Sequence, residues 1–129
     1  MKSKSLLLEN YQSVIDNGRN HSVVTDLPRG SNLGASALEL TVMSLAGCIS
    51  TIFKTTAEKM RIPVERIEVE IDAEKGSDTI TKVHYRSKVK SEATEAQLNR
   101  CLELTEKNCP VGVLFARAGV EIEGELERL

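Results

Sequence analysis

Two thiols are the residues best able to do chemistry in this sequence. Cys48 lies in the apolar run LTVMSLAGCISTIF (40–53), and Cys109 directly precedes a proline in the segment NCPVG (108–112). A thiol at a position where an aliphatic side chain would pack well, with a second thiol available elsewhere, indicates redox chemistry. Two buried cysteines that serve only in packing would leave the same pattern, so both interpretations remain open from these residues alone.

A cysteine reacts as its thiolate, and the two positions differ in how they would favour one. Cys48 is predicted in the middle of a buried helix, where burial disfavours the charged form and the helix N-terminus is too distant to help. An ionised Cys48 therefore requires a cationic partner, and an arginine is the best candidate. Cys109 is predicted at the start of a short helix, near unpaired backbone N–H groups that favour a thiolate. The alternative for each is a packing residue.

The third cysteine needs no functional explanation. Cys101 falls among Leu98, Leu102 and Thr105 on one apolar helical face, where a small buried hydrophobe fits. The two histidines lie far from Cys48 and Cys109 in the sequence, and there is no C-x-x-C pair. We therefore expect no metal site and no bound cofactor.

Composition excludes several classes of function. The 129 residues are 40% hydrophobic and 28% charged with a net charge of −2, which is typical of a soluble globular protein. No basic cluster is present, so nucleic-acid binding has no electrostatic basis. The longest uncharged stretch (40–53) is shorter than the about 20 residues of a membrane span, and no signal peptide is recognisable. We expect a cytoplasmic protein, not bound to a membrane, whose cysteines are free or transient thiols.

The best-marked element is a long central helix, predicted over about 36–61. Ser36 and Glu39 match the S-x-x-E capping box directly before an apolar pattern. Apolar residues at helical spacing then cover most sides: Leu38, Val42, Leu45, Ile49, Ile52 and Phe53. A helix that is apolar on most sides is expected to be buried. Pro63 disfavours the helical conformation at the residue before it, so the helix should end near residue 61.

Strands are predicted on both sides of this helix. Residues 4–27 have the pattern of two strands joined by the hairpin turn Asn17-Gly18. A second hairpin pairs the alternating segment 67–73 with 79–90, so that acidic residues of one strand face basic residues of the other. That arrangement is typical of a solvated sheet surface.

The C-terminal part is predicted to hold two helices and a strand. A second capping box at 94–97 begins a helix that ends at Pro110, and Pro110 suits the first position of a short helix over 110–118. The segment 120–126 alternates as an edge strand. The resulting order, β-β-α-β-β-α-α-β, is typical of an α+β fold with antiparallel sheets. We expect one domain over residues 1–129.

Together these motifs resemble the OsmC/Ohr family, whose name joins osmotically induced protein C with the organic hydroperoxide resistance protein. The segments GASALELTVMSLAGC (34–48) and CPV (109–111) carry the resemblance, which covers nearly the whole chain. The predicted order of elements is similar to the α+β OsmC-like fold. The pattern S-x-x-E-L…LAGC is most similar to the less characterised branch of the family.

The resemblance implies thiol-dependent reduction of organic hydroperoxides. In that mechanism Cys48 attacks the O–O bond and becomes a sulfenic acid, and Cys109 condenses with it to a disulfide. An external dithiol then reduces the disulfide, without any bound cofactor. The resemblance also implies an intertwined homodimer with each active site at the subunit interface.

Two further catalytic residues follow from the resemblance. Family members hold the thiolate with an arginine near the first hairpin turn and a glutamate at the start of the central helix. Arg19 and Glu39 are the counterparts in this chain, although Glu39 also has a structural role as the capping partner of Ser36. Arg29, and after it Arg117, are the alternatives to Arg19.

The sequence is compatible with two functions from different classes. The leading hypothesis is a cysteine-based hydroperoxide reductase that favours apolar substrates. The aliphatic residues expected to form its pocket are Leu45, Ile49, Val111, Val113 and Leu114. The alternative is a redox-sensing or small-ligand-binding protein without efficient turnover, indicated by Ala35 and Ala37 where the peroxidase members carry prolines. A structural protein with inert thiols is the third interpretation.

Overall fold

The computed structural model describes residues 1–129 and divides into two compact units, residues 1–43 and 44–129. Helix α1 (Ala37–Lys59) begins in the first unit and continues through the second. The single domain expected over the whole chain stays a prediction.

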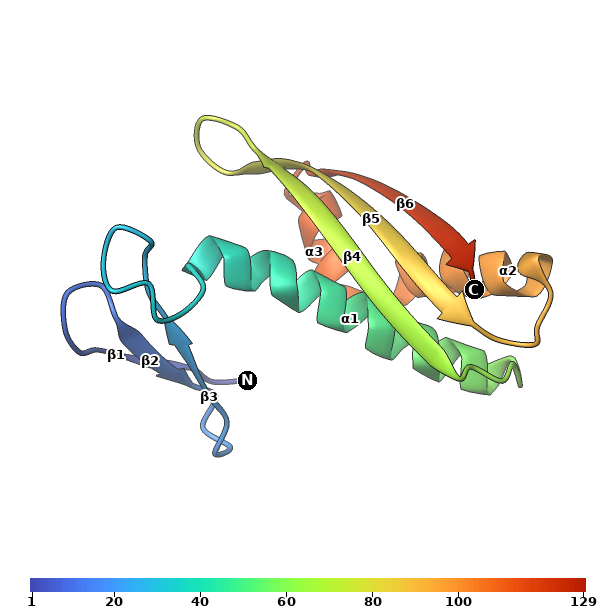
Figure 1. Cartoon of the computed structure of the whole chain (residues 1–129), viewed down its shortest axis with the longest axis horizontal. Helices are drawn as coiled ribbons and strands as arrows, with labels where there is room; N and C mark the ends of the chain where they lie inside the picture. Colours follow the sequence, from blue (N-terminus) through green and yellow to red (C-terminus); the bar gives the residue numbers. More distant parts are fainter. The chain divides into compact units, whose positions relative to one another are not determined.

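The first unit contains a three-stranded antiparallel sheet in the order β1-β2-β3 (Figure 1). Its strands are β1 (Lys4–Leu7), β2 (Ser13–Asp16) and β3 (Ser22–Thr25). The predicted Asn17-Gly18 turn joins β2 to β3, and Gly18 has the positive φ of 74° that glycine adopts without strain.

This sheet has one strand more than the sequence predicts. The first segment is interrupted at residues 8–12, where the Leu8 N–H donates to the Gln12 carbonyl and Asn10 adopts a φ of 51°. Asparagine tolerates this left-handed conformation, so it supports a turn in a segment that otherwise resembles one strand. The observed order is β-β-β-α-β-β-α-α-β.

Helix α1 begins with the predicted capping box. The Glu39 N–H donates to Ser36 Oγ, and the Ser36 N–H donates to Glu39 Oε2, both at 3.1 Å. The helix has 23 residues, and an 18-residue stretch of it has a mean hydropathy of 1.4, so by length and composition alone it could cross a membrane. In the second unit it instead contributes a core stripe, formed by Leu45, Ile49, Phe53, Thr56 and Ala57.

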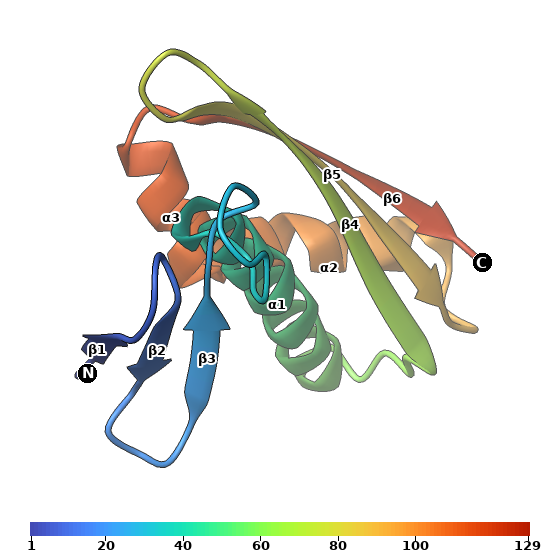
Figure 2. The same cartoon turned by 60° about the vertical axis from the view of Figure 1, so that its left-hand side comes forward.

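The second unit is a three-stranded sheet with helices on one side (Figures 1 and 2). Strands β4 (Arg66–Lys75) and β5 (Ile80–Lys90) form the predicted hairpin. Helices α2 (Glu95–Asn108) and α3 (Pro110–Arg117) follow, and β6 (Glu121–Arg128) completes the sheet in the order β4-β5-β6.

The second sheet differs from the antiparallel arrangement expected from the sequence at β6. Strands β4 and β5 are antiparallel, but β6 pairs with β5 in the parallel direction. A parallel pair needs a long crossover connection, and helices α2 and α3 supply it by returning the chain to the end of the sheet where β5 begins.

The two faces of this sheet differ in character. The inward residues of β5 are fully buried and face the helices: Val83, Tyr85, Ser87 and Val89. They share the core with Phe53, Leu98 and Phe115. The central strand therefore joins the sheet to all three helices.

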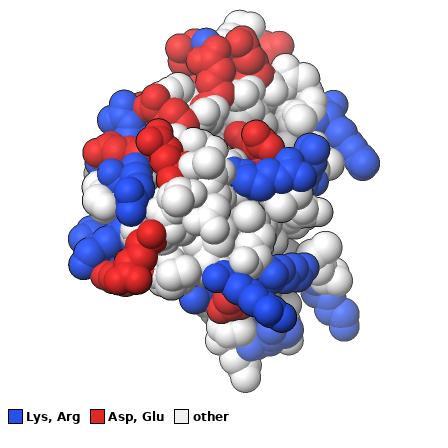
Figure 3. Space-filling model, turned by 90° about the vertical axis from the view of Figure 1, so that its right-hand side faces the viewer, with Lys and Arg blue, Asp and Glu red and all other residues white.

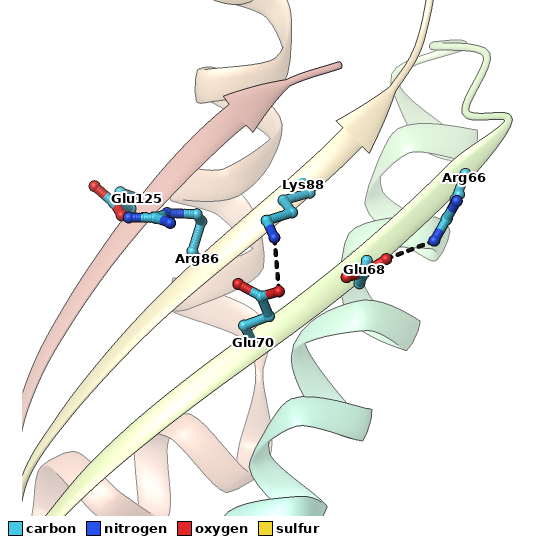
Figure 4. Close-up of polar contacts among 6 residues, drawn as sticks. All are labelled: Arg66, Glu68, Glu70, Arg86, Lys88 and Glu125. Carbon is cyan, nitrogen blue, oxygen red and sulfur yellow. Dashed lines mark hydrogen bonds and ion pairs between the residues drawn. The ribbon is translucent and has the colours of Figure 1, made fainter.

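The opposite face carries the charges predicted for a solvated surface (Figure 4). Three ion pairs with N–O distances of 2.6 Å lie on it: Lys88–Glu70, Arg66–Glu68 and Arg86–Glu125. Exposed pairs contribute about 0–1 kcal/mol each. Side chains of both signs are also interspersed on the face drawn in Figure 3.

Candidate active site

The two thiols highlighted by the sequence lie together in the second unit. Cys48 Sγ and Cys109 Sγ are 2.7 Å apart, and both cysteines are free. A disulfide bond is about 2.05 Å long, so a relative displacement of roughly 0.7 Å would bring the sulfurs to bonding distance. The pair has the geometry of a dithiol that can close to a disulfide.

Helix packing and two helix caps position these sulfurs. Cys48 is half-buried in the middle of α1, between the core residues Leu45 and Ile49. Cys109 is the single residue between α2 and α3. Its N–H donates to the Thr105 carbonyl at the end of α2, and its Sγ accepts from the Gly112 N–H at the start of α3.

The protonation state of Cys109 differs from the sequence-based expectation. Burial raises the pKa of the Cys109 thiol to about 11, and the adjacent Cys48 adds to the rise. The backbone N–H groups of Gly112 and Val111 oppose this effect but are outweighed. The expectation that the start of α3 favours a Cys109 thiolate is therefore wrong for the reduced pair. Cys109 keeps its proton and donates a hydrogen bond to Cys48 Sγ.

The third cysteine has the environment of a packing residue. Cys101 is fully buried, and its Sγ lies 3.7 Å from the carbonyl oxygen of Phe53. Burial raises the pKa of its thiol. Cys101 can therefore serve as an internal control in experiments on the reactivity of Cys48 and Cys109.

A cavity of about 270 Å³ lies beside Cys109. Its wall includes Cys109 but not Cys48. The aliphatic part of the wall is formed by Leu45, Ile49, Val113, Ala116 and Ile122. The cavity is therefore largely apolar and has one thiol in its wall.

The pocket expected from the sequence agrees with this cavity in part. Leu45, Ile49 and Val113 line it, as expected. Val111 and Leu114 do not, and Leu114 is 64% exposed. Helix α3 presents only one of its faces to the core, and periodicity alone did not identify which face.

One polar pair in the cavity wall was missed from the sequence. Tyr85 is only 1% exposed, and its hydroxyl donates to Glu106 Oε1 at 2.5 Å. Burial and this carboxylate raise the pKa of the phenol, so Tyr85 stays protonated. The one feature of the sequence that is related to this buried tyrosine is Gly124. It pairs with Tyr85 in the parallel register of β5 and β6. A Cβ at Gly124 would lie 2.2 Å from the tyrosine ring, so only glycine leaves room for it.

The remaining predicted site residues lie in other parts of the chain. Glu39 occupies the first turn of α1, with Oε2 committed to the helix cap. Arg19 is in the turn between β2 and β3, where its N–H donates to Asn17 Oδ1. The Arg29 guanidinium lies 4.7 Å from the ring centre of Tyr11, and Arg117 is exposed in the last turn of α3. Pairing of an arginine with Cys48 stays a prediction.

The structure contains no cluster of side chains suited to binding a metal ion. No group of three or more histidine, cysteine, aspartate or glutamate side chains could hold a metal ion.

Comparison with known proteins gives one family and many similar folds. The family model described as OsmC-like protein matches residues 30–125. An OsmC-like protein from Mycoplasma pneumoniae superimposes with a TM-score of 0.90 at 13% identity, covering 99% of this chain and 96% of that chain. The comparison with curated proteins gave no match.

Two further similar structures have names that refer to hydroperoxides. An organic hydroperoxide resistance protein OsmC from Legionella pneumophila has a TM-score of 0.77 at 12% identity and covers 98% of this chain and 95% of that chain. The organic hydroperoxide resistance protein OhrB of Bacillus subtilis has a TM-score of 0.68 at 14% identity and covers 98% of each chain. At these identities the likeness establishes the fold.

Proposed function

Because the chain belongs to the OsmC-like protein family, we propose that it is a cysteine-based peroxidase that reduces organic hydroperoxides. The observation that carries the proposal is the 2.7 Å separation of Cys48 Sγ and Cys109 Sγ. The names of the similar Legionella and Bacillus proteins support it. We further propose that the protein acts in the cytoplasm, where thiols stay reduced.

The proposed cycle has three steps. The Cys48 thiolate attacks one oxygen of ROOH, the O–O bond breaks, and the alkoxide leaves and is protonated to the alcohol. Cys109 then attacks the sulfur of the Cys48 sulfenic acid, water leaves, and the disulfide forms. An external dithiol donates two electrons, restores both thiols and leaves as a disulfide.

The different environments of the two thiols support this order of roles. Cys48 is half-buried and accepts a hydrogen bond from Cys109. Cys109 is 1% exposed, and its raised pKa keeps it protonated until Cys48 has reacted. The more accessible sulfur therefore meets the peroxide first.

We propose that Arg19 supplies the positive charge for Cys48 and that Glu39 orients the arginine. The sequence resemblance supports both roles. The cap on α1 uses only Oε2 of Glu39, which leaves Oε1 for an arginine. Arg29 is already stacked on Tyr11, and this favours Arg19 over its first alternative. Arg117 is the second alternative.

The apolar neighbourhood of Cys48 supports a preference for organic hydroperoxides over hydrogen peroxide. Leu45 lies one turn before Cys48 on α1, and Ile52 lies one turn after it. An alkyl or aryl group gains free energy from such contacts, whereas hydrogen peroxide has no group to place there. Equal rates of consumption of cumene hydroperoxide and hydrogen peroxide would contradict this preference.

We also propose that the protein is a homodimer. Large apolar side chains are exposed in the first unit: Leu6, Leu7, Leu8, Leu33 and Met43. An interface between two subunits would bury exposed apolar side chains of this kind. Light scattering should give twice the mass of the 14.2 kDa chain, and a monomer at micromolar concentration would contradict the proposal.

A redox-sensing or ligand-binding protein without efficient turnover is the alternative. The largely aliphatic cavity beside Cys109 favours it, because such a cavity can bind a small molecule without any reaction. This alternative predicts slow, stoichiometric oxidation of the thiols and no sustained cycle.

The two functions are separated by steady-state consumption of cumene hydroperoxide with an excess of dithiol. Peroxidase activity predicts many turnovers in the wild type, none in Cys48→Ser, and wild-type turnover in the control Cys101→Ser. Consumption that stops after one equivalent per chain in the wild type would favour the sensing or binding protein.

A further inference from the structure

We propose that Tyr85 and Glu106 form the path by which the buried Cys109 thiol passes its proton to solvent when it attacks oxidised Cys48. The path runs from the thiol to the Tyr85 hydroxyl and from there to the Glu106 carboxylate. The inference rests on the proposed Cys48–Cys109 disulfide, and it adds two residues to the step that closes this bond.

The burial of Cys109 creates the need for such a path. A thiol attacks another sulfur as its thiolate, so Cys109 has to lose a proton when the disulfide forms. Its side chain is 1% exposed, and burial raises the pKa of the thiol to about 11. At neutral pH the thiol therefore holds its proton and has almost no contact with bulk water. Closure of the disulfide needs a base inside the protein.

Cys48 cannot be that base once it has reacted. In the reduced pair the Cys109 thiol donates a hydrogen bond to Cys48 Sγ. After oxidation Cys48 Sγ is the atom under attack, and its oxygen leaves on the side opposite the incoming sulfur. The remaining direction is the cavity of about 270 Å³ in whose wall Cys109 lies. The proton therefore leaves through this cavity.

The cavity wall contains one side chain that can take up the proton. Apart from Cys109, its titratable side chains are Tyr85, Glu106 and Lys107, and the residues contributed by α1, α3 and β6 are not titratable. The Lys107 ammonium group has no lone pair to accept a proton. Glu106 is the only carboxylate, and it lies on an exposed residue near the end of α2. It can therefore accept a proton from the cavity and release it to solvent.

Tyr85 connects the buried thiol to this carboxylate. Its hydroxyl donates to Glu106 Oε1 at 2.5 Å, so its oxygen can still accept a hydrogen bond from another donor. Negative charge on Cys109 contributes to the raised pKa of Tyr85, which shows that the two groups influence each other. The Cys109 thiol meets the tyrosine oxygen directly or through one water molecule, for which the cavity has ample volume.

The raised pKa of Tyr85 determines how the proton moves. The phenol does not ionise near neutral pH, so it receives one proton on its oxygen as it gives up another. Tyr85 stays neutral throughout, and only Glu106 changes its charge. Such a transfer suits a side chain that is itself only 1% exposed, because no charge is placed on it.

The step balances in atoms and charge. The Cys109 proton passes to the Tyr85 oxygen while the tyrosine proton passes to Glu106. Cys109 Sγ forms a bond to Cys48 Sγ, the S–O bond breaks, and hydroxide leaves with the electron pair and takes up a proton from solvent. Glu106 then releases its proton to solvent. The products are the disulfide and one water molecule.

The test replaces the peroxide with dithiodipyridine, so it does not depend on peroxidase activity. One equivalent per chain reacts with Cys48 and releases a first thiopyridone. Cys109 then attacks the mixed disulfide and releases a second thiopyridone. Stopped-flow absorbance separates the two phases, and only the second phase requires Cys109 to lose its proton. Cys109→Ser should show the first phase alone, which assigns the phases.

Two variants interrupt the path at different points. Tyr85→Phe keeps the buried ring and removes the hydroxyl, whereas Glu106→Gln keeps an acceptor for Tyr85 and removes the base. We expect each variant to slow the second phase at pH 7 by roughly a hundredfold, the contribution typical of a general base, and to leave the first phase unchanged. Loss of the Glu106 charge alone would have the opposite effect, because it favours the Cys109 thiolate and would speed the second phase.

The pH profile of the second phase separates a proton path from a structural role. In the wild type this rate should change little between pH 7 and pH 9, because the base is part of the cavity wall. In both variants Cys109 has to lose its proton to hydroxide, so the rate should rise by about tenfold per pH unit while the pH is below the pKa of Cys109. A loss of rate that is equal at every pH would overturn the inference.

A matched control lies on the same helix. Glu103→Gln removes a negative charge from an exposed position of α2 outside the cavity and should leave both phases unchanged. A wild-type second phase in either Tyr85→Phe or Glu106→Gln would overturn the inference. A protein that shows both phases but consumes no cumene hydroperoxide contradicts only the proposed function, whereas a wild type that stops after the first phase contradicts both.

Discussion

Cys48 Sγ and Cys109 Sγ lie 2.7 Å apart although 61 residues separate them in the chain. The contact joins the middle of α1 to the junction of α2 and α3, and core side chains such as Leu45, Ile49 and Phe115 surround these elements. Packing therefore holds both sulfurs at a distance from which a disulfide can close with little movement.

Glu39 has a helix-capping role in the structure and a proposed catalytic role. Glu39→Gln preserves an acceptor for the Ser36 N–H but removes the charge, since glutamine also completes a capping box. We expect unchanged thermal stability and at least a tenfold loss of kcat/KM for cumene hydroperoxide, about 1.4 kcal/mol of transition-state stabilisation.

The complementary variant is Ser36→Ala, which removes the cap and keeps the charge. It should lower the free energy of unfolding by about 1 kcal/mol and leave kcat/KM near the wild-type value. If Glu39→Gln keeps full activity, Glu39 is a cap and nothing more.

Arg19 is expected to promote the thiolate of Cys48. Arg19→Ala should slow alkylation of Cys48 by iodoacetamide at pH 7 by about tenfold, since a nearby positive charge favours the thiolate. Arg29→Ala and Arg117→Ala are the matched controls and should react at the wild-type rate. If one of these two controls shows the slow alkylation instead, that arginine is the partner of the Cys48 thiolate.

Gly124 is expected to be required for the position of Tyr85. Gly124→Ala places a methyl group 2.2 Å from a ring that is buried and cannot move aside freely. We expect a loss of about 1–3 kcal/mol in the free energy of unfolding, measured by urea denaturation. Gly112→Ala, whose methyl group meets only ordinary contacts, should show no such loss.

The raised pKa of Cys109 predicts a loss of stability in alkali. The folded protein holds this proton up to about pH 11, whereas an unperturbed thiol releases it near pH 9. Between these values the folded state binds more protons than the unfolded state, so the free energy of unfolding falls as pH rises. The expected fall is about 2 kcal/mol.

The matched variant for this measurement is Cys109→Ser, which can still cap α3. Tyr85 also has a raised pKa and adds to the alkaline loss in both proteins. The wild type should therefore lose more stability than Cys109→Ser between pH 9 and pH 11. Parallel curves would show that Cys109 titrates normally in the folded state.

Much of the fold was predictable because its local signals are strong. The capping boxes at Ser36 and Thr94 and the proline at position 110 correctly placed all three helix starts. The α+β OsmC-like fold is confirmed. The parallel pairing of β6 was not predictable, since the direction of a strand depends on where its connection crosses the sheet and not on its own alternation.

Only those site residues whose type is itself reactive could be predicted from the sequence. Cysteine is rare enough that Cys48 and Cys109 stood out, and the structure brings them together. Tyr85 and Glu106 looked like an inward strand residue and a solvated helix residue, and only the packing of α2 against the sheet makes them a pair. The pKa of Cys109 depends on three-dimensional burial, which outweighs the helix start that the sequence shows.

The most direct test of the account is the mass of the intact protein after one equivalent of cumene hydroperoxide at neutral pH. The proposed cycle predicts the loss of two hydrogens and of two free thiols, with peptide mapping to a Cys48–Cys109 disulfide and with Cys101 still free. An unchanged mass with three free thiols would contradict the account and return both cysteines to a role in packing.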